Sequence, residues 1–244
     1  MRTLIISDVH SNLEGLLAVV AHAEASGPVE AVWNLGDIVG YGAEPSAAIG
    51  ELHRLGVRSV AGNHDHAAAG RVDIDLFNPT AAEAVLWTRD IISPQERDWL
   101  GALPETLTIG DFTLVHVSLR EPLWEYIDNS ETAREQFDRQ QTPYSIVGHL
   151  HVPFWCEERD GEWPVFHMTR DGDRVELGDG RIILNPGSTG QPRDGDPRAG
   201  YLLYDDAERA VTWRRVAYDA EAAGRKIIAA GLPEFLANRL LIGR

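Results

Sequence analysis

Residues 3–10 read Thr-Leu-Ile-Ile-Ser-Asp-Val-His, an apolar run that stops abruptly at an aspartate and a histidine. The run over residues 3–7 is rich in β-branched side chains and predicts a buried strand. Asn12 follows as the expected N-cap of a helix whose apolar residues recur at helical spacing. A strand, a polar turn and a helix in succession are typical of an α/β unit.

Four further segments follow the same plan, each an apolar run that ends at Asp, Asn or His. Because ligand sites in open α/β sheets lie beyond the carboxyl ends of the strands, five strand ends can deliver these side chains to one place. A glycine before the polar residue suits a tight turn that lets the backbone approach a ligand. The four segments end in Gly36-Asp37, Gly62-Asn63-His64-Asp65, Leu114-Val115-His116 and Gly148-His149-Leu150-His151.

The remaining pattern predicts α/β (α+β) architecture with some parallel pairing. Helices are expected after Pro45, over residues 80–102 and over residues 130–140, and a hairpin is expected around Gly110-Asp111. No repeat or long linker interrupts the chain, so one domain over residues 1–244 is expected, with a tail of two helices at about 219–244. Short strands separated by Asp-Gly turns are expected at 144–147, 153–156, 165–169, 181–184, 200–204 and 211–216.

Composition narrows the classes of partner and compartment. The chain has 244 residues, of which 22 are Lys or Arg and 38 are Asp or Glu, giving a formal charge of −16. Such a charge repels polyanions, so neither a nucleic acid polymer nor an anionic membrane is expected as a partner. A single cysteine, Cys156, excludes an internal disulfide and a multi-cysteine zinc module. Without a membrane-spanning run or a signal peptide, a cytoplasmic protein is expected, and a homo-oligomer is compatible with the sequence.

The polar residues at the strand ends have the chemistry of metal ligands. Imidazole, carboxylate and amide donors without thiolate suit Mn²⁺, Fe²⁺, Zn²⁺ or Ni²⁺. The candidates are too many for one ion but enough for two if one carboxylate is shared, and Asp37 is the sensible bridge because both its oxygens can ligate. The candidate ligands are Asp8, His10, Asp37, Asn63, His116, His149 and His151.

Charge arithmetic indicates an anionic substrate. Two divalent cations with Asp8 and Asp37 leave a site near +2, and near +1 after a bridging hydroxide, so a phosphate ester is the obvious class of ligand. Two metal ions roughly 3.5–4 Å apart lower the pKa of a bridging water and clamp the oxygens of an in-line displacement. His64, which follows a candidate ligand, is free to protonate the leaving oxygen, a contribution of about 10²–10⁴-fold.

The ordered blocks D-x-H, G-D, G-N-H-D, a later His and G-H-x-H resemble the calcineurin-like metallophosphoesterase superfamily over roughly residues 3–217. The stretch Asn-Pro-Gly-Ser-Thr-Gly-Gln-Pro-Arg from residue 185 is similar to its small bacterial and archaeal phosphodiesterase-like branch. The resemblance implies a four-layer αββα sandwich. It also implies a metal-dependent phosphodiesterase or phosphatase acting on a small phosphate ester, in which a metal-bridging hydroxide attacks phosphorus without a covalent enzyme intermediate.

The resemblance also implies a role for each residue. His64 is implied as the general acid, oriented by Asp37 or Asp65, which makes these three the catalytic residues. Val117 stands where the family usually has glycine after the histidine, so we expect it to shift the His116 loop or narrow the pocket. In the implied ligand sets, Asp8, His10 and His151 bind the first metal, Asn63, His116 and His149 bind the second, and Asp37 bridges them.

Each feature also has a plainer explanation. Taken singly, Asp8 is more often a capping residue and His116 a core histidine, and only the joint order favours a metal site. Arg193 and Arg198 can contact a substrate phosphate or form salt bridges within their turn, and the salt bridges are favoured. The alternative function is a catalytically silent scaffold that binds a partner protein, which has no need of an intact ligand set. Asn12 and Tyr41 are weak candidates for the pocket.

Overall fold

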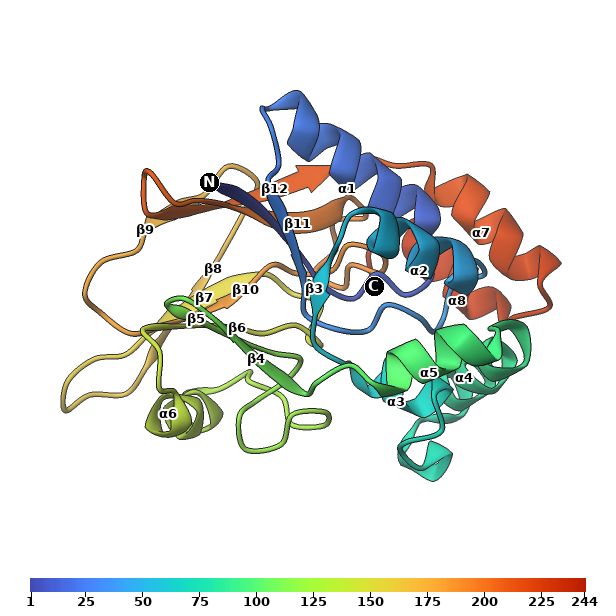
Figure 1. The fold of residues 1–244 in the computed structure, drawn as a ribbon, viewed down its shortest axis with the longest axis horizontal. Helices are drawn as coiled ribbons and strands as arrows, with labels where there is room; N and C mark the ends of the chain where they lie inside the picture. Colours follow the sequence, from blue (N-terminus) through green and yellow to red (C-terminus); the bar gives the residue numbers. More distant parts are fainter.

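Two six-stranded mixed sheets pack face to face, with helices on both outer sides, in a computed structural model that describes residues 1–244 (Figure 1). The predicted four-layer sandwich is confirmed. Helices α1 (Leu13–Ala25) and α2 (Pro45–Arg54) lie over the outer face of one sheet, and α6 (Ser130–Arg139) lies over the outer face of the other.

The first sheet has the order β3-β2-β1-β11-β12-β9 and joins residues from both ends of the chain. Its parallel half contains the first three strands, and β11 runs antiparallel to β1. Strand β9 is absent from the sequence prediction because its three residues carry no apolar run. The strands are β1 (Arg2–Ile6), β2 (Ala31–Asn34), β3 (Arg58–Ser59), β9 (Arg174–Glu176), β11 (Ala199–Asp205) and β12 (Ala210–Val216).

The second sheet has the order β4-β5-β6-β10-β7-β8. Its central strands β5, β6 and β10 are parallel, and the predicted hairpin around Gly110-Asp111 joins β4 to β5. The strands expected from residue 144 onward are confirmed to within two residues at each end. The strands of the second sheet are β4 (Thr106–Ile109), β5 (Phe112–Val115), β6 (Tyr144–Ile146), β7 (Phe154–Glu157), β8 (Val165–Met168) and β10 (Ile182–Asn185).

Most of the helices begin after a residue whose side chain caps them. Asn12 caps α1, as predicted, by accepting the N–H of Gly15, and the expected helix over 80–102 is two helices divided by the capping residue Ser93. Two helices, α7 and α8, form the end of the chain. The helices are α1 (Leu13–Ala25), α2 (Pro45–Arg54), α3 (Asn63–Ala68), the 3₁₀ turn η1 (Ile74–Leu76), α4 (Pro79–Ile91), α5 (Pro94–Gly101), α6 (Ser130–Arg139), α7 (Ala220–Ala229) and α8 (Glu234–Leu240).

Alternation along β1 divides the core into layers. Leu4 and Ile6 face the outer helices, whereas Ile5 faces the second sheet, where Trp33 and Trp213 are also buried. Each such fully buried apolar side chain stabilises the fold by about 1.5–3 kcal/mol. This packing holds the two sheets face to face, so the carboxyl ends of β1 and β2 lie beside those of β5 and β6.

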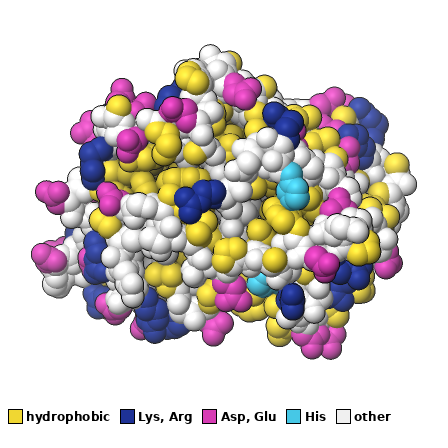
Figure 2. All heavy atoms as spheres, viewed as in Figure 1, with side chains coloured by type: hydrophobic (Ala, Val, Ile, Leu, Met, Phe, Trp, Pro, Cys, Tyr) yellow, Lys and Arg dark blue, Asp and Glu magenta, His cyan; other side chains and the backbone are white.

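Charged side chains of both signs are interspersed on the face shown in Figure 2. None of the helices is long and apolar enough to cross a bilayer.

Candidate metal centre

The carboxyl ends of strands from both sheets meet at one place, as the sequence pattern predicts. Asp8 follows β1 in the first sheet, and its Oδ2 accepts the N–H of His149, which follows β6 in the second sheet, at 3.1 Å. His116 follows β5, and its Nδ1 lies 2.7 Å from the carbonyl oxygen of Leu35, which follows β2. The two sheets are therefore joined at this edge by the residues that the sequence singles out.

Three of these side chains form a first group of ligand atoms. Nε2 of His151 lies 3.2 Å from both Oδ1 of Asp8 and Nε2 of His10. The three atoms lie within 4.8 Å of one another, and all three side chains are buried. This is the set that the family resemblance implies for a first metal.

A second group lies against the first. Oδ2 of Asp37 is 3.4 Å from Nε2 of His116, which is in turn 3.2 Å from Nδ1 of His149. Asn63, the first residue of α3, is buried, and its Oδ1 has no hydrogen-bond partner. The structure thus brings all seven predicted ligands into one cluster.

Asp37 lies between the two groups. The same oxygen, Oδ2, is 3.6 Å from Nε2 of His10 and 3.4 Å from Nε2 of His116. Its other oxygen, Oδ1, accepts the backbone N–H of His64 at 2.9 Å. Asp37 is therefore placed to share one oxygen between two sites while it fixes the start of α3.

Backbone carbonyls orient three of the histidines. Nδ1 of His10 lies 3.0 Å from the carbonyl of Val39, and Nδ1 of His151 lies 2.6 Å from that of Gln191. The carbonyl of Leu35 does the same for His116. A carbonyl can only accept, so each Nδ1 carries a proton, and each Nε2 can present a lone pair to the cluster once the ring is neutral.

The backbone that carries the ligands is strained. Five of the predicted ligands adopt left-handed φ angles, a conformation that side chains other than glycine rarely take and that costs about 1–3 kcal/mol per residue. Such strain persists only where the surrounding structure enforces it, and it concentrates at functional sites. The residues are Asp8 (54°), His10 (47°), Asp37 (54°), His149 (63°) and His151 (60°).

Burial and neighbouring charges set the protonation of the cluster. Burial lowers the pKa of His149 to about 3 and that of His64 to about 4. Burial also disfavours charge on His116, but the adjacent Asp37 outweighs it and raises the pKa of His116 to about 9. Burial likewise opposes ionisation of Asp37, yet His116 holds the pKa of this carboxyl well below its usual range. The cluster therefore holds two carboxylates among mostly neutral imidazoles.

These residues fit divalent metal ions. Oδ1 of Asp8 and Oδ1 of Asn63 are buried acceptors without a hydrogen-bond partner, which is costly unless a cation binds them. Neutral imidazole, carboxylate and amide oxygen together suit borderline divalent cations.

His64 and Asp65 occupy different positions beside the ligands. The His64 ring is buried 4.9 Å from the ring of His10, and its Nδ1 has no hydrogen-bond partner. Asp65 accepts three backbone N–H groups, from Ile38, Val39 and Gly62. It therefore ties the loop after β2 to the start of α3, and its predicted part in catalysis remains a prediction.

A cavity of about 240 Å³ opens onto both groups of ligand atoms. Tyr41 and Arg193 line it, as do three aromatic residues that the sequence analysis does not single out: Phe77, Trp124 and Tyr126. The signal for Trp124 and Tyr126 is weak, because it consists only of two aromatic residues within a polar loop.

Other sequence expectations are resolved at the edge of the site. Val117 does not line the cavity and leaves His116 beside Asp37. Arg198 pairs with Asp196 and Asp171, as the favoured interpretation holds, whereas Arg193 forms no ion pair with a carboxylate side chain.

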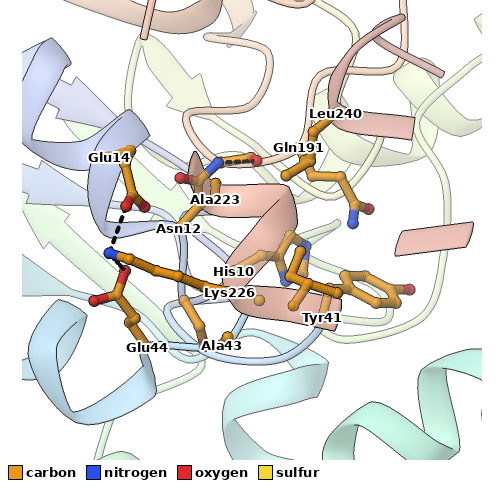
Figure 3. A pocket seen from close by; sticks show the side chains of 14 residues that line it. His10, Asn12, Glu14, Tyr41, Ala43, Glu44, Gln191, Ala223, Lys226 and Leu240 are labelled. Atoms are coloured by element: carbon orange, nitrogen blue, oxygen red, sulfur yellow. Dashed lines mark hydrogen bonds and ion pairs between the residues drawn. The ribbon is translucent and has the colours of Figure 1, made fainter. Parts of the chain in front are cut away.

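The C-terminal tail closes the back of the site. Lys226 of α7 pairs with both Glu14 and Glu44, and Ala223 and Leu240 pack nearby, behind His10 (Figure 3). Asn12 is directed away from the ligand cavity, because its side chain caps α1 and donates to the carbonyl of Gly190. The tail thus supports the loop that carries His10.

Comparison with known proteins identifies the class to which this fold and site belong. Residues 1–208 match the model of the calcineurin-like phosphoesterase superfamily domain. The chain belongs to this superfamily of phosphoesterases, and its His and Asp residues are positioned to bind divalent metals.

Similar proteins come from both bacteria and archaea. A metallophosphoesterase of Sphaerobacter thermophilus is 43% identical, with a TM-score of 0.90 over 100% of this chain and 99% of that one. An uncharacterized protein of Methanocaldococcus jannaschii is 35% identical over 98% of this chain and 97% of its own length. A hypothetical protein of Pyrococcus horikoshii shares the fold, with a TM-score of 0.78 at 20% identity, over 100% of this chain and 98% of that one.

Proposed function

We propose that this protein is a two-metal phosphodiesterase or phosphatase that hydrolyses a small phosphate ester. The observation that carries the proposal is the position of Oδ2 of Asp37 between Nε2 of His10 and Nε2 of His116, with a complete group of donors on either side. Asp8, His10 and His151 would hold one ion, and Asn63, His116 and His149 the other. The donor set suits Mn²⁺, Fe²⁺, Zn²⁺ or Ni²⁺.

The residues lining the cavity favour direct attack by water. When bound, two divalent cations supply a water of lowered pKa and positive charge for the phosphoryl oxygens. No serine, threonine or cysteine lines the cavity, so the chain offers no hydroxyl or thiol of these types to form a covalent intermediate. The water oxygen bonds to phosphorus, the ester P–O bond breaks, and the leaving oxygen takes up a proton.

His64 is placed to supply that proton. It lines the cavity beside Asp37 and His10 without belonging to either group that holds a metal in this proposal. In the free protein burial lowers the pKa of His64 to about 4, so the ring is neutral at pH 7. A phosphate ester in the cavity brings negative charge beside the ring and favours the protonated form that a general acid requires.

The test is hydrolysis of bis-p-nitrophenyl phosphate and p-nitrophenyl phosphate with each of the four metal ions. The His64→Ala variant should lose about 10²–10⁴-fold in turnover while it retains its metal content. His22→Ala is the matched control, because His22 lies on α1 and contacts Tyr201 rather than the cavity. Unchanged turnover in His64→Ala would remove His64 from the mechanism, and inactivity with every ion would favour the silent scaffold.

A further inference from the structure

The cavity above the metal groups has two unlike walls. Arg193 and Tyr41 form the wall beside the first group, with the guanidinium carbon of Arg193 5.7 Å from the centre of the Tyr41 ring. Phe77, Trp124 and Tyr126 form the wall beside His64 and His149. A ligand that fills the cavity meets a cation at one end and aromatic rings at the other.

The charge of Arg193 is not neutralised by any Asp or Glu side chain. Its Nη2 donates to the neutral Oε1 of Gln191 at 2.8 Å, and its buried Nε has no partner. Arg239 of α8 donates to the same Oε1 at 3.0 Å, so two guanidinium groups share one uncharged acceptor. Arg198 and Arg215, close by in the fold, both pair with aspartates.

An arginine held in this way is suited to an anion. Guanidinium groups match the oxygens of phosphate in geometry and charge. The backbone N–H of Arg193 also donates to the carbonyl of His151, so the side chain starts from a fixed point beside the first group. Arg193 is therefore placed to complete a phosphate site. The other positive charge of that site would come from metal ions bound by the two groups of ligand atoms.

The aromatic wall is assembled from two separate loops. Phe77 follows η1, and its ring lies 5.0 Å from those of both His64 and Trp124. Trp124 and Tyr126 lie in the loop between β5 and α6, and Tyr126 is 46% exposed with its ring 4.5 Å from that of His149. Phe77 packs partly against the core formed by α4, α7 and α8, whereas Trp124 and Tyr126 belong to no core cluster. Large rings that face a polar cavity offer planar surface to a flat ligand.

We propose that the substrate is a nucleotide, with its base against Phe77, Trp124 and Tyr126 and its phosphate between Arg193 and the metal groups. The inference rests on the proposed function and names its substrate class. The His64 ring lies 4.4 Å from that of Tyr41 and 5.0 Å from that of Phe77, between the two walls, where it can reach the oxygen that joins the phosphate to the nucleoside. A cavity of about 240 Å³ leaves room beyond a single phosphate group.

The test compares two ligands that differ only in the base, adenosine 5′-monophosphate and ribose 5-phosphate. Calorimetric titration of the metal-loaded His64→Gln protein measures binding without turnover. The nucleotide should bind about 5- to 150-fold more tightly, which is the range for stacking of one base. In the Trp124→Ala variant this advantage should disappear, while the affinity for ribose 5-phosphate stays the same.

Matched variants separate the two walls. Arg193→Gln should weaken both ligands equally, whereas Arg198→Gln, whose arginine is paired with Asp196, should weaken neither. Trp163→Ala is the control for Trp124→Ala, because Trp163 is 56% exposed and stacks with Arg134 away from the cavity. Tyr126→Ala is a second aromatic variant, chosen because the Tyr126 side chain is 46% exposed.

The outcomes distinguish the inference from the function on which it rests. Equal affinity for the two ligands, or an equal loss of both in Trp124→Ala and in Tyr126→Ala, would overturn the nucleotide inference and leave the phosphoesterase in place. Binding of neither ligand, together with inactivity towards the p-nitrophenyl esters, would overturn both.

Discussion

Glycine occurs at both ends of the two sheets, but for different reasons. At the metal centre, a Cβ on Gly62 would overlap Asp37, and one on Gly148 would overlap Ser7. At the far end, Gly110 and Gly180 have nothing within 4 Å of an added Cβ. Glycine at the far end serves the turn itself, whereas glycine at the metal centre makes room for side chains that hold ligands. The site is thus the densely packed end of the molecule.

The largest effect should come from removing the shared ligand. Asp37→Ala takes away the oxygen that both groups approach and the acceptor for the N–H of His64. We expect metal content and turnover to fall together to background, measured by elemental analysis and by ester hydrolysis. The control is Asp111→Ala, an exposed aspartate at the far end. Retention of both metals in Asp37→Ala would contradict the bridging role.

Removal of the metals should have the second largest effect, and it should affect the two ends of the sheets differently. An ion that binds only the folded protein stabilises it by about 2.7 kcal/mol at a hundred times its dissociation constant. Chelation should therefore lower the melting temperature and speed hydrogen exchange in the loops after β1, β2 and β6. Exchange in the turn between β7 and β8, at the far end, should not change. A melting temperature that is indifferent to Mn²⁺ would refute this expectation.

Two glycine-to-alanine variants test the difference in packing between the two ends of the sheets directly. Gly62 has a φ of −94°, which alanine adopts readily, so the cost of Gly62→Ala is purely steric. We expect a loss of about 1–3 kcal/mol in the free energy of unfolding, with weaker metal binding. Gly180→Ala should stay within about 0.5 kcal/mol of the parent in urea unfolding. Equal stability of the two variants would mean that the crowding around Gly62 relaxes freely.

The smallest expected effect is a gain in the free energy of unfolding rather than a loss. Gly50 lies exposed within α2, with nothing within 4 Å of an added Cβ. Gly50→Ala should stabilise the protein by about 0.5–1 kcal/mol, because alanine loses less backbone entropy on folding. Thermal unfolding measures the gain, and unchanged ester hydrolysis would show that the helix and the metal centre vary independently.

The sequence predicts the ligand cluster well because its signal is local. A polar residue directly after an apolar run is visible without knowledge of the fold, and such residues lie at the carboxyl ends of β1, β2, β5 and β6. The parallel pairing of these strands then places them at one edge. Strand β9 has no such signal, since only Val175 of its three residues is apolar and the segment becomes a strand by pairing with β12.

The side chains around the ligands are harder to predict because their roles are set by tertiary contacts. Arg193 and Arg198 lie five residues apart in the same turn, yet only Arg198 reaches aspartates. The difference arises because Gln191 and Tyr41 hold Arg193 over the cavity. In the same way, Phe77 and Trp124 become neighbours only once their two loops are folded.

The pairing of β1 with β11 has a consequence for how the protein acquires its ions. Leu4 pairs with Leu203, and the carbonyls of Ser7 and Asp8 accept the N–H groups of Thr189 and Gly190. Asp8 is therefore held in place by a segment that is translated after all the candidate ligands. We expect a nascent chain to remain without its metals until this segment has been synthesised, so that a product truncated before it cannot sequester them.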